Sequence, residues 1–243
     1  MDPRYESQTL AVEDHHWWYR GRRRIVADAV ARLALPAGAR ILDAGCGSGR
    51  NLELLTAFGA VTGLEPSGAS LEAARGRGVG RVVAGSIEAM PFDDGSFDVA
   101  TSLDVIEHTD DAAALAELRR VVRPGGVLLV TVPAYPALWG PHDVVNRHRR
   151  RYTRSSLLEA AAAAGWAPVS TTHFNALLLA PAAALRLLSR RGPSADGSDF
   201  ERTPQGLNAF LEQVLLAEAA FLRTGRRIPF GLSLMGVFTR SRA

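Results

Sequence analysis

The chain has 243 residues, of which 47% are hydrophobic and 22% are charged, with 23 glycines and one cysteine. This apolar content is enough for a full hydrophobic core, and it excludes a disordered or collagen-like chain. The single cysteine, Cys46, excludes an intramolecular disulfide framework and favours a reducing, cytoplasmic location. The sequence contains no lysine, so arginine supplies all 28 basic residues, and the net charge is only +3.

The ends of the chain and its apolar runs bear on membrane association. The first 16 residues are polar and contain no apolar segment of the kind that signal peptides carry. The longest apolar runs, such as residues 174–185, are shorter than the roughly 20 residues that span a bilayer. We therefore expect no membrane span, and contact with a membrane surface stays open.

Strand-like and helix-like runs alternate along the first 175 residues, which is typical of a parallel, doubly wound α/β sheet covered by helices. In chain order, we predict a helix over 13–33, a strand over 40–44, a helix over 50–58, a strand ending at 64–65, a helix over 70–75, strands over 81–84 and 97–102, a helix over 112–122 with a Pro-Gly-Gly turn after it, a strand over 127–132, a helix over 153–164, a strand over 167–174, helices over 176–189 and 205–223 separated by a loop over 190–204, and a strand over 232–240.

A glycine-rich segment follows the first predicted strand. The strand ends near Asp43 and continues into Gly45, Gly47 and Gly49, with a helix directly after. Such a loop allows close backbone approach to a ligand at the carboxyl end of a strand, where open α/β sheets bind nucleotides. A dinucleotide fingerprint would need glycine where Arg50 stands, and a phosphate-binding P-loop would need a lysine.

The pattern D-x-G-x-G-x-G over 43–49 resembles the first motif of class I S-adenosylmethionine-dependent methyltransferases. Residues 61–67, 82–111 and 119–133 resemble the following segments of these enzymes, in the same order. The resemblance is to bacterial small-molecule enzymes of the methyltransferase type 11 kind. It implies a Rossmann-like fold with a mostly parallel, seven-stranded sheet whose last strand is reversed. We expect one domain, made of an N-terminal lid helix (1–38), a cofactor-binding core (39–174), a helical insertion (175–231) and the final strand (232–243).

The resemblance also implies which residues contact S-adenosylmethionine. Glu65, 22 residues after Asp43, corresponds to the carboxylate that accepts both ribose hydroxyls. Ser86 stands where the family usually has an acidic residue beside the adenine amine, and Ile87 would pack on the adenine face. The complete predicted set is Asp43, Gly45, Cys46, Gly47, Gly49, Glu65, Pro66, Ser86, Ile87, Leu103 and Arg20. Asp43 could instead only brace the glycine loop.

The aromatic and arginine-rich start of the chain resembles a bacterial subset of these methyltransferases. Trp17, Trp18 and Tyr19 could form a lid over the sulfonium, and Arg20 or a neighbouring arginine could bind the cofactor carboxylate. The alternative is an amphipathic helix whose aromatic side chains dock on the core while its arginines are solvated.

The segment 134–157 follows the fifth strand, where loops face the substrate in this fold. Its His142 and His148 are the candidate general bases, and Asp143 could orient its neighbour His142. Five arginines between 147 and 154 could bind an acidic acceptor or form a solvated face. Both histidines could also serve only as hydrogen-bonding residues of the loop.

The spacing D-x-x-E-H of Asp104, Glu107 and His108 resembles a metal-binding arrangement in a few methyltransferases. Because E-H after the fourth strand is also widespread in this fold without metal, we expect no metal ion.

We therefore predict methyl transfer from S-adenosylmethionine to a small-molecule or lipid-linked acceptor, at an oxygen. The alternatives are a non-catalytic S-adenosylmethionine-binding regulatory module and an RNA methyltransferase. A nucleic acid partner is disfavoured, because the fourth strand lacks the N/D-P-P-Y motif of base-methylating enzymes. The apolar helices after residue 175 could form an acceptor pocket, contact a membrane surface or pair in a homodimer, and the chain could equally be a monomer.

Overall fold

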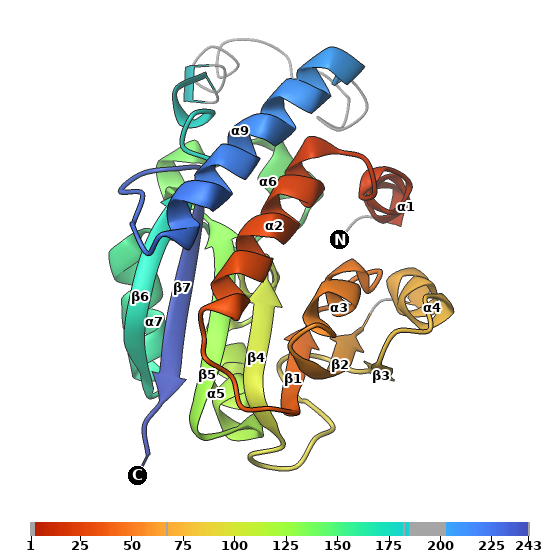
Figure 1. The fold of residues 1–243 in the computed structure, drawn as a ribbon, viewed down its shortest axis with the longest axis vertical. Helices are drawn as coiled ribbons and strands as arrows, with labels where there is room; N and C mark the ends of the chain where they lie inside the picture. Colours follow the sequence, from red (N-terminus) through yellow and green to blue (C-terminus); the bar gives the residue numbers. More distant parts are fainter. Residues whose placement is uncertain (1–2, 67, 182, 185–202, 243) are drawn as a thin grey trace.

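The computed structural model describes residues 3–66, 68–181, 183–184 and 203–242 (Figure 1). These residues form one seven-stranded sheet in the order β3-β2-β1-β4-β5-β7-β6, with helices on both faces. The strands are β1 (Ala39–Ala44), β2 (Gly59–Glu65), β3 (Arg81–Ala84), β4 (Phe97–Leu103), β5 (Val122–Pro133), β6 (Trp166–Phe174) and β7 (Ser233–Arg240). Strand β7 runs antiparallel to both of its neighbours, and the other pairs are parallel. The predicted α/β sheet with a reversed last strand is confirmed.

The helices and 3-10 turns connect these strands and cover the sheet. They are α1 (Pro3–Val12), α2 (Trp17–Ala31), α3 (Arg50–Leu55), α4 (Gly68–Gly76), η1 (Ile106–His108), α5 (Asp111–Val121), η2 (Pro136–Leu138), α6 (Pro141–Val145), α7 (Arg154–Ala163) and α9 (Gln205–Arg223). Within the described ranges, no helix is long and apolar enough to cross a membrane.

Each face of the sheet has its own hydrophobic core. On one face, α5 and α7 bury side chains such as Leu115 and Leu157 against the apolar residues of the central strands. On the other face, α2, α3 and α9 bury Ile25, Leu52 and Leu215. Because both faces are covered, the central strands carry nearly continuous apolar runs, which made them recognisable in the sequence.

The parallel strands end at the same edge of the sheet. Ala44, Glu65, Leu103 and Pro133 are the last residues of β1, β2, β4 and β5. Strand β1 has β2 on one side and β4 on the other. The order in which the strands are added to the sheet therefore changes direction at β1. A crevice at such a point is where open α/β sheets bind their ligands.

Helices α2 and α9 lie side by side across one face of the sheet (Figure 1). Gly21 of α2 permits this close approach, because a Cβ atom at this position would lie 2.5 Å from Cβ and Cδ1 of Leu215. Asn208 of α9 also bonds to the start of α2: its Oδ1 accepts from the Trp17 N–H at 2.9 Å.

Gly21→Ala is therefore expected to lower the free energy of unfolding by about 1–3 kcal/mol, since overpacking forces a shift of Leu215 or of the helices. The matched variant is Gly206→Ala in the first turn of α9, where a Cβ atom meets nothing within 4 Å. There, the higher helix propensity of alanine should leave stability unchanged or raise it by up to about 1 kcal/mol. Urea unfolding measures both values, and equal effects would contradict the packing role of Gly21.

The N-terminal helix differs from the prediction. Instead of one helix over 13–33, the chain forms α1, a turn over 13–16, and α2. His16 caps α2, because its Nδ1 accepts from the Trp18 N–H at 3.3 Å. The sequence pattern did not reveal this break, because it depends on contacts that the turn makes with distant residues.

One further prediction changes in detail. The Pro-Gly-Gly segment was predicted as a turn before a strand, but it lies inside β5, where the pairing with β4 shifts register between Phe97 and Val99. Helix 205–223 is confirmed as α9. Of the predicted helix over 176–189, residues 182 and 185–189 lie outside the described residues, and so do residues 190–202 of the predicted loop.

Candidate active site

A cavity of about 810 Å³ opens at the carboxyl edge of the parallel strands. It is lined by side chains of α1 and α2, by the glycine loop after β1, by the end of β2, by the β4–η1 segment and by residues between 142 and 151. The volume lies within the range of small-molecule and cofactor sites. The topology thus places a ligand-sized cavity at the crevice where this kind of sheet binds ligands.

The glycine loop forms the floor of the cavity. Gly45 and Gly47 have φ angles of 80° and 55°, a conformation that favours glycine. At Gly45 a Cβ atom would lie 2.5 Å from the Val105 side chain, whereas at Gly47 it would meet nothing within 4 Å. A ligand can therefore approach the backbone of Gly47 closely. Burial raises the pKa of the Cys46 thiol, which lies between these two glycines, and this favours its protonated form.

Glu65 lies at the end of β2 and points into the same cavity. Its side chain is buried, and its Oε2 accepts a hydrogen bond from the Gly47 N–H at 2.8 Å. This bond connects the carboxylate to the glycine loop. Four more residues that the sequence predicted for the cofactor also line the cavity: Pro66, Ser86, Ile87 and Leu103.

Asp43 and Gly49 lie behind the cavity rather than in its lining. In the register of the sheet, Asp43 of β1 pairs with Thr101 of β4, whose hydroxyl donates to Asp43 Oδ1 at 2.7 Å. Burial raises the pKa of Asp43 to about 7, although the Thr101 hydrogen bond opposes the rise. Asp43 is therefore bonded to the neighbouring strand β4 rather than exposed to the cavity.

The turn between α1 and α2 is bonded to the glycine loop by a buried carboxylate. Glu13 accepts from the Ser48 hydroxyl at 2.6 Å and from Arg77 Nη2 at 2.8 Å. In α1, Glu6 accepts from the Ser70 N–H at 3.1 Å. Both glutamates line the cavity, so these bonds hold the N-terminal segment at its wall. Sequence reasoning missed both glutamates, because their partners lie more than 30 residues away along the chain.

Asp143 of α6 forms a buried ionic network with two residues that follow the helix. Asp143 is fully buried, and its Oδ1 lies 2.8 Å from His148 Nδ1 and 2.7 Å from Arg151 Nε. Burial alone would raise the pKa of Asp143, but the hydrogen bonds from His148 and Arg151 outweigh it and hold the pKa well below its usual range. Asp143 therefore orients His148 rather than its sequence neighbour His142, and both histidines line the cavity.

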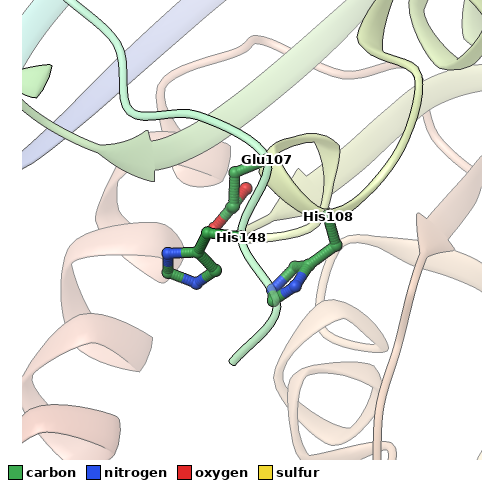
Figure 2. A group of neighbouring side chains, drawn as sticks. All are labelled: Glu107, His108 and His148. Carbon is green, nitrogen blue, oxygen red and sulfur yellow. The ribbon is translucent and has the colours of Figure 1, made fainter. Parts of the chain in front are cut away.

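Glu107 and His108 of η1 lie next to His148 at the cavity wall (Figure 2). Both carboxylate oxygens of Glu107 are buried without a hydrogen-bond partner among the described residues. Burial, followed by the nearby Asp104 carboxylate, raises the pKa of Glu107 well above its usual range. Burial and the His148 ring lower the pKa of His108 to about 4, so this imidazole is neutral.

Comparison with known proteins agrees with this geometry. The family model described as "Methyltransferase domain" matches residues 42–130. A probable S-adenosylmethionine-dependent methyltransferase of Mycolicibacterium smegmatis is 31% identical over 220 residues, which cover 88% of this chain and 81% of that protein. The chain belongs to the S-adenosylmethionine-dependent methyltransferases. It is accordingly an enzyme that uses S-adenosylmethionine as its methyl donor.

Two further similarities concern the acceptor and the fold. A ubiquinone biosynthesis O-methyltransferase of Methylocella silvestris is 31% identical over 174 residues, which cover 68% of this chain and 60% of that protein. A solved complex between the Haloferax volcanii Trm112 methyltransferase activator and a methyltransferase matches with a TM-score of 0.65 and 20% identity. This match covers 98% of this chain and 95% of that one, and it supports the class I methyltransferase fold.

The cavity of this methyltransferase is compatible with its cofactor. S-adenosylmethionine carries no phosphate group, and the glycine loop has no lysine that would bind one. The backbone of Gly47 is accessible to the cofactor instead. A buried carboxylate, Glu65, stands beside that backbone, where a ribose could offer its hydroxyls. The side chains of Ile87 and Leu103 add apolar wall for a base.

The prediction that Arg20 binds the cofactor carboxylate is not supported by its position. Arg20 is half exposed and forms an ion pair with Glu212 of α9 at 3.0 Å, outside the cavity lining. Successive residues of a helix point about 100° apart, so Arg22 and Arg23 face the cavity instead. Arg22 forms an ion pair with Asp104 and donates to the Leu103 carbonyl at 3.3 Å.

The aromatic residues predicted as a lid of this methyltransferase both line the cavity and dock on the core, so each of the two interpretations of the sequence holds in part. Trp17, Trp18 and Tyr19 line the cavity, as a lid requires. Trp18 also stacks on Phe174 of the core, with ring centres 5.8 Å apart. The arginine run over 147–154 is mostly a solvated face, because only the buried Arg151 lines the cavity.

Proposed function

We propose that this enzyme transfers the methyl group of S-adenosylmethionine to an oxygen atom of a small-molecule or lipid-linked acceptor. The cofactor supplies a methyl group on a positively charged sulfur, which is already a good leaving group. The chain's residues then have to align the acceptor and take its proton. Glu65 would hold the ribose, with Gly45 and Gly47 providing the close backbone approach.

The observation that carries this proposal is the Asp143–His148 pair at the cavity wall. A carboxylate on Nδ1 fixes the ring orientation and leaves Nε2 for a ligand. His142 lines the cavity as well, and its Nε2 lies 3.2 Å from Asn146 Nδ2. A hydroxyl acceptor must lose a proton, and either histidine could receive it.

The surroundings of these histidines support a small acceptor with an apolar part. Leu178, Leu211 and Leu232 line the cavity together with the polar side chains of the 142–151 segment. An acceptor with a hydroxyl group and an apolar body fits both kinds of wall. The O-methyltransferase of Methylocella silvestris, which this chain resembles, acts in ubiquinone biosynthesis according to its name. Contact with a membrane surface and a cytoplasmic location stay predictions.

Transfer of labelled methyl from S-adenosylmethionine into a fractionated extract, followed by identification of the labelled species, tests the proposal. We expect the label in an ether or ester of a compound with an apolar part. Label at nitrogen, or in RNA or protein, would overturn the proposed acceptor class.

His142→Asn and His148→Asn are each expected to lower kcat at least tenfold while affinity for S-adenosylmethionine stays within about twofold, because general base catalysis contributes about 10²–10⁴-fold. The matched control is His15→Asn, an exposed histidine outside the cavity lining. Single-turnover rates and the cofactor-induced shift in Tm separate the two quantities. Full activity in both cavity variants would exclude the histidines as bases.

A further inference from the structure

Three side chains at the acceptor end of the cavity lie close enough to share one ligand (Figure 2). The candidate ligand atoms of Glu107, His108 and His148 all lie within 4.8 Å of one another. Glu107 and His108 come from η1, and His148 comes from the segment after α6, so only the tertiary fold brings the three together. All three line the cavity, so an ion between them would be open to the acceptor.

The carboxylate of Glu107 is buried at the cavity wall without a hydrogen-bond partner among the described residues. Its side chain is only 1% exposed. Two cavity arginines, Arg151 and Arg22, bind the carboxylates of Asp143 and Asp104 and not that of Glu107. Burying such a group is costly unless something pairs with it. A cation between Glu107 and the imidazoles would supply that partner.

His148 is held in the way that metal-binding histidines usually are. His148 Nδ1 lies 2.8 Å from Asp143 Oδ1, which leaves its Nε2 as the nitrogen for an ion. His108 also lines the cavity, and its ring centre lies 4.6 Å from that of His148. A carboxylate or a carbonyl behind the imidazole is the usual second partner of a metal ligand, because it orients the ring and raises its basicity.

We propose that Glu107, His108 and His148 together bind one divalent transition-metal ion of the series Mn²⁺ to Zn²⁺. Two imidazoles and one carboxylate favour these ions over Mg²⁺ and Ca²⁺, which prefer oxygen ligands. Three protein ligands leave coordination positions open for an oxygen of the acceptor. The role of the ion rests on the proposed O-methylation, and it replaces the expectation of no metal that the sequence alone suggested. Of the three residues of the D-x-x-E-H motif, only Glu107 and His108 belong to the proposed ligand set. Asp104 binds Arg22, and His148 supplies the third ligand in its place.

The ion also gives the two candidate bases, His142 and His148, different roles. With His148 as a ligand, His142 is left to take the proton of the acceptor hydroxyl. Binding of that hydroxyl to a divalent ion lowers its pKa, so the proton leaves more easily. The new carbon–oxygen bond forms as the carbon–sulfur bond of the cofactor breaks. The electron pair of the broken carbon–sulfur bond stays on sulfur. One proton is released for each methyl group transferred.

Ion binding can be measured without acceptor or cofactor. The protein is freed of metal with a chelator, dialysed against Mn²⁺ or Zn²⁺, and assayed for bound metal. We expect one ion per chain, and affinity at least tenfold weaker in Glu107→Gln, His108→Asn and His148→Asn. His142→Asn and His15→Asn are matched controls, because both remove an imidazole outside the proposed ligand set, and they should bind the ion like the original chain. The cofactor-induced shift in Tm verifies that each variant is folded.

Nitrogen couplings in the pulsed electron paramagnetic resonance of the Mn²⁺ complex give a second test, on the unaltered chain. Coupling to imidazole nitrogen supports the site even where a ligand variant fails to fold. No binding, no nitrogen coupling, or equal binding in ligand variants and controls would overturn the site, and Glu107 would then be a neutral, protonated carboxyl. If the ion binds but the metal-free enzyme methylates its oxygen acceptor at the full rate, the catalytic role falls and the proposed function stands. If the enzyme methylates no oxygen acceptor while the ion binds as expected, the proposed function fails and the site stands.

Discussion

Asp143→Asn is expected to lower the free energy of unfolding by about 3–5 kcal/mol, because it leaves Arg151 as a buried charge without its carboxylate. The Arg151 side chain is 4% exposed and that of Asp143 is 0% exposed, so solvent screens this ion pair little. Such a loss is a large fraction of the total stability of a typical domain, about 5–15 kcal/mol. The variant also frees the ring of His148 to rotate, so turnover should fall together with stability.

The effect of Asp143 should depend on pH in a defined direction. Its pKa is well below the ordinary value of 3.8 in the folded state, so its contribution to stability is present above about pH 4. That contribution decreases as the pH falls below 3.8 towards the folded-state pKa. Urea unfolding of the original chain and the variant at pH 7 and at pH 3 should therefore show a smaller difference at pH 3.

Asp94→Asn is the matched control for this prediction. Asp94 also forms an ion pair, with Arg120 Nη1 at 2.9 Å, but its side chain is 78% exposed. An exposed pair contributes at most about 1 kcal/mol, so this variant should unfold nearly like the original chain. Similar losses in both variants would contradict a special role of the buried network.

Glu65→Ala is expected to weaken the binding of S-adenosylmethionine at least 100-fold. A carboxylate that accepts both ribose hydroxyls makes two hydrogen bonds to a charged group, each contributing about 1.5–3 kcal/mol. At a concentration of 100 times its Kd, the cofactor stabilises the original chain by about 2.7 kcal/mol, and a 100-fold weaker Kd reduces this to about 0.4 kcal/mol. The shift in Tm on adding the cofactor should therefore nearly disappear.

The control for Glu65 is Glu72→Ala, which removes an exposed carboxylate of α4 at the same side of the sheet. It should keep the full cofactor-induced shift. Because Glu65 also accepts from the Gly47 N–H, the Tm without cofactor is measured for both variants, and the shift is taken from that value. An unaltered shift in Glu65→Ala would refute the ribose assignment.

Much of the cofactor half of the site was predictable because it depends on short stretches of chain. Gly45, Cys46 and Gly47 follow β1 directly, and the spacing to Glu65 is that of one strand–helix–strand unit. In such a unit the strand ends meet at one edge, so the residues in the loops after the strands are brought together by local structure. Eight of the eleven predicted cofactor residues line the cavity for this reason, and Asp43, Gly49 and Arg20 do not.

The acceptor half was less predictable because its contacts join distant segments. The sequence pairs Asp143 with its neighbour His142, but α6 turns that carboxylate toward His148 and Arg151. The sequence also groups Glu107 with Asp104. The positive φ of Asp104 and its ion pair with Arg22 direct the Asp104 side chain to α2 instead. Neither outcome can be read from spacing, since each depends on the packing of another element.

The sequence by itself determined the class of this protein, the order of its strands along the chain and its methyl donor. Apolar periodicity and glycine positions act over a few residues, so they survive in a linear pattern. Only the tertiary structure decided which carboxylate orients which histidine, which arginine faces the cavity, and that Glu107 and His108 meet His148. Such contacts are set by the packing of helices against the sheet, where a rotation of one residue along a helix changes the direction of a side chain by about 100°.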